Sequence, residues 1–233
     1  LAQAMEAEAT RLGLATILCN VRASTVREAE YVHMLLERRV DGMIFVSSEA
    51  ADLAADHGHY KLLLEEGACL VFVNGAADEL DVPRVGVDER AAGQIATQHL
   101  IDLGHRRIGF VAGPKRFLPT QEKLAGRQLA RSSAGIPEDE ALVAHAPFSV
   151  AGGRRALREL LALGPGRPTG VICSSDLMAI GALQEARAAG LRVPADLSIV
   201  GFDGIDAANW VDPPLTSVEQ PIADIAETAV STL

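Results

Sequence analysis

The chain alternates between short apolar runs and longer segments in which apolar residues return at helical spacing. The apolar runs predict strands at 14–19, 42–46, 69–73, 84–87, 107–112, 142–145, 171–173, 199–200 and 216–218. The helical spacing predicts helices at 1–12, 25–39, 50–66, 89–103, 119–133, 150–163, 221–233 and after Ser175. Gly104 directly follows one of these segments, a position where glycine commonly ends a helix. Such alternation is typical of parallel sheets covered by helices, so an α/β fold is expected.

The length of this alternation bears on the domain organisation. The strand and helix pairs are too numerous for one simple six-stranded sheet, and they lack the eightfold repeat of a barrel. Two similar lobes therefore fit the pattern better, and a ligand pocket would be expected between them.

Polar residues follow two of the predicted strands at the point where each strand ends. Ser174–Asp176 come after the run 171–173, and Asp203 comes after Phe202. Ligands of open parallel sheets bind outside the carboxyl ends of the strands, so Ser175 and Asp203 are expected to face one crevice. A carboxylate beside an aromatic ring suits a polyhydroxylated ligand. The alternatives are that Ser175 caps its own helix and that Asp203 caps the following turn.

Composition narrows the class of protein. With 48% hydrophobic residues among 233, the chain can bury a sizeable core, and it has no apolar run near the roughly 18 residues of a membrane span. A net charge of −10 argues against direct binding to nucleic acid, so any DNA contact must come from elsewhere. Cys19, Cys69 and Cys173 lie in apolar runs without ligand spacing, which predicts reduced core residues in a cytoplasmic protein.

Motifs of catalysis, cofactor binding or metal binding are not evident in the sequence. It contains neither GxxxxGK[ST] nor GxSxG, and the run 164–170, GPGRPTG, follows a helix instead of preceding one. His57 and His59 with Asp56 could ligate a metal, but a solvated helix face is favoured because no second ligand cluster is near. The other histidines are scattered and are interpreted as structural. No cofactor, metal or enzymatic activity is therefore expected.

Several motifs resemble those of a known family. RRVDGMIF at 38–45, DLGHRRIGFVAGP at 102–114, the long segment 168–205 with VICSSD and SIVGFD, and PPLTSVEQP at 213–221 closely resemble the effector-binding core of the lactose-repressor (LacI/GalR) family of bacterial transcriptional regulators. The resemblance implies a type I periplasmic-binding-protein-like fold of two Rossmann-like lobes. It places residues 1–87 with 221–233 in one lobe and 88–220 in the other. The family's first strand, hinge helix and helix-turn-helix headpiece are expected before Leu1.

The resemblance also implies a set of site residues. Those expected to contact the effector are Ser48, Asn74, Lys123, Phe148, Ser175 and Asp203. Lys123 stands where the family usually has Arg, which weakens bidentate binding of a carboxylate or a vicinal diol. Asn74 replaces a common Asp, and its amide adds a hydrogen-bond donor. Ile180 and Trp210 match dimer-interface positions, although Ile180 could equally be ordinary core.

The function implied is that of a sensor. In the family, a small metabolite such as a sugar or nucleoside binds between the lobes and changes the affinity of the headpiece for operator DNA. The protein is expected to be a cytoplasmic homodimer that binds neither a membrane nor a cofactor. It is expected to contact operator DNA only through a headpiece outside this chain. The alternatives are a periplasmic sugar-binding protein of an ABC transporter and, less favoured, an α/β enzyme.

Overall fold

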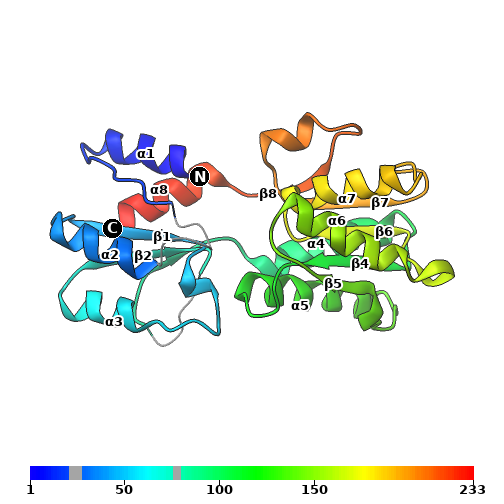
Figure 1. Ribbon diagram of the computed structural model, residues 1–233, viewed down its shortest axis with the longest axis horizontal. Helices are drawn as coiled ribbons and strands as arrows, with labels where there is room; N and C mark the ends of the chain where they lie inside the picture. Colours follow the sequence, from blue (N-terminus) through cyan, green and yellow to red (C-terminus); the bar gives the residue numbers. More distant parts are fainter. Residues whose placement is uncertain (21–27, 76–79) are drawn as a thin grey trace. The chain divides into compact units, whose positions relative to one another are not determined.

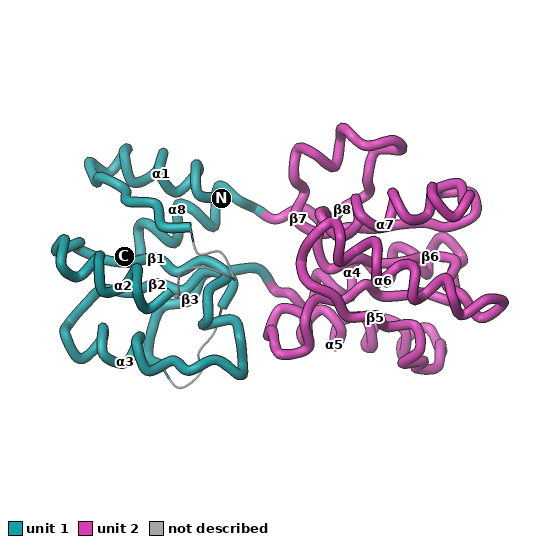
Figure 2. Tube along the Cα trace, in the orientation of Figure 1, with its two compact units in different colours: residues 1–87, 221–233 teal, residues 88–220 magenta. Residues whose placement is uncertain are grey.

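The computed structural model describes residues 1–20, 28–75 and 80–233. The chain divides into two compact units, which are coloured separately in Figure 2. Unit 1 comprises Leu1–Val87 with Pro221–Leu233, and unit 2 comprises Asp88–Gln220.

Unit 1 is built on a parallel sheet of three described strands in the order β1 (Gly42–Val46), β2 (Cys69–Val73) and β3 (Arg84–Val85). Alternate residues of a strand point to opposite faces of a sheet, so β2 builds two cores. Val71 and Val73 pack with α1 (Ala2–Arg11) and α8 (Ile222–Thr232), which lie side by side in Figure 1. Phe72 packs on the opposite face with residues of α2 (Glu28–Glu37) and α3 (Gly58–Glu65).

Unit 2 contains a fully parallel five-stranded sheet in the order β5-β4-β6-β7-β8. The strands are β4 (Ile108–Ala112), β5 (Val143–His145), β6 (Gly170–Cys173), β7 (Ser198–Asp203) and β8 (Thr216–Glu219). One face packs against α4 (Glu89–Asp102) and α5 (Leu118–Ser133), and the other against α6 (Val150–Leu161) and α7 (Asp176–Ala188). All carboxyl ends of these strands therefore meet at one edge of the sheet.

Glycines allow the helix pair α4 and α5 to pack with their backbones in close approach. A Cβ at Gly93 would collide with the carbonyl of Lys123, and one at Gly126 would collide with the carbonyl of Arg90. This close packing of α4 and α5 fixes the position of Lys123, on α5, relative to the ends of the strands. Gly104 has a φ of 91°, which confirms its predicted role behind α4.

Two predicted elements of unit 1 are wrong. The apolar run 14–19 forms no strand, because apolar character does not make a strand without a neighbouring strand to pair with. Within this run, Leu18 is 73% exposed. The helix predicted at 50–66 is instead a 3₁₀ turn, Glu49–Ala51, followed by α3. Asp52 and Asp56 accept hydrogen bonds from nearby backbone N–H groups between these pieces, which competes with helix formation. Residues 25–27 of the helix predicted at 25–39 lie outside the described residues.

Two predictions about side chains are also corrected. Cys173 is a buried core residue, but Cys69 is exposed and Cys19 only partly buried, because each lies where its strand or segment has no cover. The segment with His57 and His59 is not a solvated helix face. His57 is buried with its Nε2 3.0 Å from the Glu49 carbonyl, and the His59 Nε2 lies 3.1 Å from the Glu28 carboxylate.

Candidate ligand-binding site

Asp203 is the last residue of β7 and adopts a strained backbone conformation. Its φ is 111°, a region that residues other than glycine rarely occupy. The Gln220 side chain, at the end of β8, donates a 2.7 Å hydrogen bond to the Asp203 carboxylate. Burial raises the pKa of the Asp203 carboxyl to about 6, although the Gln220 hydrogen bond and the Lys123 charge oppose the rise. Asp203 is thus a fixed, half-buried acceptor at the strand ends.

Asp176 holds the loop that follows Asp203. It is fully buried at the start of α7, and its two oxygens accept hydrogen bonds from the Ser217 hydroxyl at 2.6 Å and the Ile205 N–H at 2.9 Å. Gly201 makes room for it, since a Cβ there would collide with the Asp176 carboxylate. No role was predicted for this aspartate from the sequence. The available signal was its position at a helix start, directly after a buried strand.

Ser175 is the N-cap of α7. Its Oγ accepts a hydrogen bond from the Met178 N–H at 3.3 Å, which is the capping alternative weighed for this residue. Its hydroxyl proton is not used by that bond. The neighbouring Ser174 is buried as well, and its Oγ has no hydrogen-bond partner among the described residues.

Phe148 lies beyond the end of β5 and covers the end of β4. A Cβ at Gly113 would collide with both the Phe148 ring and the Thr120 hydroxyl, so all three groups are closely packed. Phe148 is 41% exposed, and its ring meets that of Phe117 edge to face at 6.1 Å. This part of unit 2 offers an aromatic surface next to a hydroxyl group.

Lys123 lies on α5, as the sequence indicated, and its charge is already engaged. Its ammonium group forms an ion pair with Glu89 and lies 5.1 Å from the centre of the Phe202 ring. The side chain is buried, so the pair is fixed near the end of β7.

Ser48 and Asn74 occupy equivalent places in unit 1, after β1 and β2. Ser48 caps the 3₁₀ turn, its Oγ accepting from the Ala50 N–H at 3.3 Å. Asn74 has a φ of 55°, and Ser47, which precedes Ser48, has a φ of 47°. The Asn74 Oδ1 is buried without a described partner. Strained backbone therefore recurs at the strand ends of this unit as well.

The two residues expected at a dimer interface have different surroundings within unit 2. Trp210 follows the 3₁₀ turn Asp206–Asn209 and is 80% exposed. Ile180 is half-buried on α7. An exposed tryptophan is uncommon on a free protein surface.

Buried polar atoms without a described hydrogen-bond partner occur near strand ends in each unit. In unit 1 this is Asn74 Oδ1, after β2, and in unit 2 these are Ser174 Oγ after β6, Gln220 Oε1 after β8 and Thr120 Oγ1, which lies on α5 beside Gly113 at the end of β4. Leaving such an atom unpaired costs about 1–3 kcal/mol, which a polar ligand could recover. The remaining atoms of this kind belong to Arg127 and Arg131 on α5.

Comparison with known proteins defines the class to which this fold and these strand ends belong. A family model described as a periplasmic binding protein-like domain matches residues 97–233. An uncharacterised HTH-type transcriptional regulator in the aml 5′ region of Streptomyces limosus is 43% identical over 235 residues, which cover 100% of this chain and 66% of the relative. The HTH-type transcriptional regulator MalR of Streptomyces coelicolor is 39% identical, with coverage of 100% and 68%. The chain thus spans about two thirds of the length of these relatives.

Solved structures agree with this class. The complex of the transcriptional regulator CelR with cellobiose has a TM-score of 0.86 at 33% identity, covering 100% of this chain and 69% of that chain. A LacI family transcriptional regulator from Enterococcus faecium with bound ribose has a TM-score of 0.86 at 27% identity, covering 99% and 82%. The chain belongs to the periplasmic-binding-protein-like domain family and corresponds to the effector-binding core of LacI-family transcription regulators.

These findings decide between the expectations drawn from the sequence. The α/β class with parallel sheets and the family resemblance are confirmed. The transporter alternative is not favoured, because these relatives are named as transcription regulators and not as enzymes or transport proteins. Among the described residues, no helix combines the length and apolar character needed to cross a membrane.

Proposed function

We propose that this chain is the effector-binding and dimerisation part of a ligand-responsive bacterial transcription regulator. A small polyhydroxylated metabolite, a sugar or a related polyol or nucleoside, binds at the strand ends and favours one of two conformational states. Operator DNA is contacted by a helix-turn-helix segment outside these 233 residues. The effector shifts operator affinity only as far as it binds one state better than the other.

The observation that carries this proposal is the set of unpaired, buried polar atoms at the strand ends together with the strained acceptor Asp203. The Ser174 and Thr120 hydroxyls can each donate and accept, whereas the ionised Asp203 only accepts. Phe148 offers an aromatic ring to the apolar face of a sugar. The cellobiose and ribose in the two similar solved structures support this ligand class.

The proposal assigns a role to each of the six expected contact residues. Asp203 and Ser48 accept from ligand hydroxyls, Asn74 pairs through its amide, and Phe148 covers the ring. Ser175 donates the proton that its cap leaves unused. Lys123 supplies the N–H groups that its ion pair with Glu89 does not occupy.

The proposal extends to the oligomeric state and the cellular location of the protein. Trp210 and Ile180 form part of a contact with a second copy of the chain, which accounts for an exposed tryptophan. The regulator works in the cytoplasm, where its operator lies, and catalyses no reaction.

A thermal-shift screen of sugars, sugar phosphates, polyols and nucleosides tests the proposal. A ligand at 100 times its Kd stabilises the protein by roughly 2.7 kcal/mol. We expect at least one neutral sugar to raise the Tm, and Asp203→Ala to weaken its binding by about 1.5–3 kcal/mol, as for a hydrogen bond to a charged group. Asp102→Ala is the matched control, since Asp102 is exposed at the end of α4 and its one described hydrogen bond comes from the Gln98 side chain. Equal binding by wild type and Asp203→Ala would refute the assigned site.

A further inference from the structure

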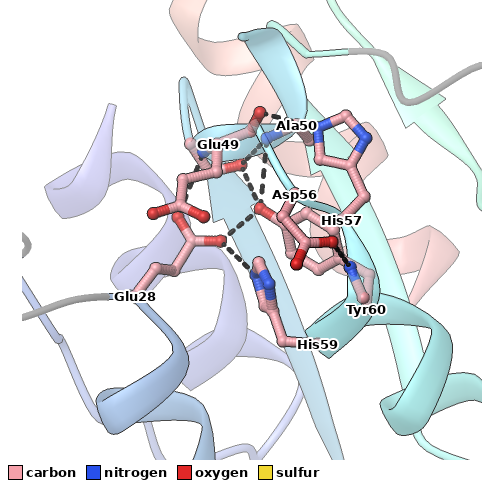
Figure 3. A network of polar contacts seen from close by, with 9 residues as sticks. Glu28, Glu49, Ala50, Asp56, His57, His59 and Tyr60 are labelled. Atoms are coloured by element: carbon pink, nitrogen blue, oxygen red, sulfur yellow. Dashed lines mark hydrogen bonds and ion pairs between the residues drawn. The ribbon is translucent and has the colours of Figure 1, made fainter. Parts of the chain in front are cut away.

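A buried carboxylate lies behind the loop that carries Ser48. Glu28, at the start of α2, is 5% exposed, and three groups surround its oxygens in Figure 3. The Glu49 N–H donates at 3.2 Å, the His59 Nε2 lies at 3.1 Å, and the Tyr60 hydroxyl donates a hydrogen bond to the same carboxylate. Glu28 is thus bound as an acceptor by residues that follow β1 and begin α3.

The Tyr60 ring cannot easily turn away from this carboxylate. It is fully buried and packs edge to face against Phe45 at 5.0 Å and Phe72 at 4.9 Å. Its hydroxyl is therefore held in place by the core of unit 1, and not by the loop that it contacts.

Proton counting at the Tyr60 hydroxyl fixes the direction of each hydrogen bond. A phenol has one proton and two lone pairs, and the proton points to the charged Glu28 oxygen because charged acceptors bind more strongly. The Ala50 N–H donates to the Tyr60 oxygen at 3.1 Å. The Ser48 Oγ lies 3.1 Å from the same oxygen, so Ser48 must be the donor of that bond.

We propose that Glu28 and Tyr60 are positioning residues that make Ser48 a hydrogen-bond acceptor toward the ligand. With its only proton turned to Tyr60, Ser48 offers a lone pair, so the ligand group that meets it must be a donor. A hydroxyl fits this requirement, whereas a phosphate or carboxylate oxygen does not. The nearby negative charge of Glu28 adds repulsion against an anion. The proposal rests on the proposed function of Ser48 as an effector contact, and it narrows the effector to neutral, hydroxyl-bearing molecules such as unphosphorylated sugars.

The proton arrangement can be tested without any ligand, in the full chain. A hydroxyl proton held between a buried phenol and a buried carboxylate should exchange slowly and give a resolved downfield proton resonance. We expect one such resonance that disappears in Tyr60→Phe and Glu28→Gln, and that persists in Ser48→Ala. The chain has only two tyrosines, so Tyr31→Phe is the matched control and should retain it. Loss of the resonance in Ser48→Ala but not in Glu28→Gln would overturn the proposal, because Tyr60 would then donate to Ser48.

Calorimetry with cellobiose and ribose tests the consequence for specificity. For whichever sugar binds, Tyr60→Phe should weaken binding by roughly two- to tenfold, the effect of one neutral hydrogen bond, while Tyr31→Phe should not. Ribose 5-phosphate should bind more weakly than ribose. Sugar binding that depends on Asp203 but is unchanged in Tyr60→Phe would refute this inference and leave the proposed function standing. If neither these two sugars nor any compound of the wider screen binds, the proposed function fails, and the proton resonance still decides how Ser48 is oriented.

Discussion

Replacing Asp203 by asparagine should make the protein more stable at neutral pH, since the native carboxyl is ionised there in a buried place. Burial raises its pKa from an ordinary value of 3.8 to about 6. An acid whose pKa is higher in the folded state stabilises the fold when protonated. That stabilisation is fully present below the unfolded pKa and is lost as the pH rises through the folded pKa. A rise of this size corresponds to at most about 3 kcal/mol.

Urea unfolding of wild type and Asp203→Asn across this range measures the effect. Between about pH 4 and pH 7, the free energy of unfolding of the wild type should fall by about 2 kcal/mol more than that of the variant. Asparagine can still accept from Gln220, so the hydrogen bond at this position is kept. Parallel pH profiles for the two proteins would show that Asp203 titrates normally and would refute the reasoning.

The same ionisation sets the pH dependence of binding. A carboxylate only accepts hydrogen bonds, whereas a protonated carboxyl also donates. If Asp203 accepts from ligand hydroxyls, sugar affinity should decline as the pH falls below about 6, while the fold gains stability. Opposite trends of stability and affinity would indicate that the site keeps its charge for binding at a cost to the fold.

Two further predictions concern other parts of the chain. Glu138→Gln should lower the free energy of unfolding by about 1.5–3 kcal/mol, because the exposed Glu138 is the carboxylate that pairs with the buried Arg127 and lies 4.0 Å from the buried Arg131. Glu140→Gln is the control at a second exposed glutamate, and equal urea midpoints of wild type and Glu138→Gln would contradict the assignment. Trp210→Ala should shift sedimentation toward the monomer, because this side chain is 80% exposed within the chain and its removal disturbs no packing inside unit 2. An unchanged dimer constant would remove Trp210 from the interface.

Local pattern was sufficient wherever an element is defined by its own residues. The strands β1 and β2 were predicted with the bounds they have, because a buried parallel strand is a continuous apolar run between polar ends. The capping alternative at Ser175 could be stated beforehand for the same reason, since a cap involves only neighbouring residues.

Prediction failed where distant residues decide the outcome. The cluster around Tyr60 depends on Glu28, which is 32 positions earlier in the sequence, so no local pattern could distinguish it from a solvated face. The strand predicted at 14–19 is absent for a related reason, because a strand needs a hydrogen-bonded neighbour that the run itself cannot supply. Asp176 was missed because its partners, Ile205 and Ser217, are 29 and 41 positions away.

The two units hold their strand-end loops in the same way. In each, a fully or almost fully buried carboxylate, Asp176 in unit 2 and Glu28 in unit 1, binds the loop that follows a strand. Asp176 accepts from the Ile205 N–H and the Ser217 hydroxyl, and Glu28 from the Glu49 N–H and the Tyr60 hydroxyl. Neither carboxylate needs to touch a ligand, because each orders the residue beside it that is proposed to do so. A loop ordered in advance loses little conformational entropy on binding, so these buried acids should contribute to affinity through preorganisation.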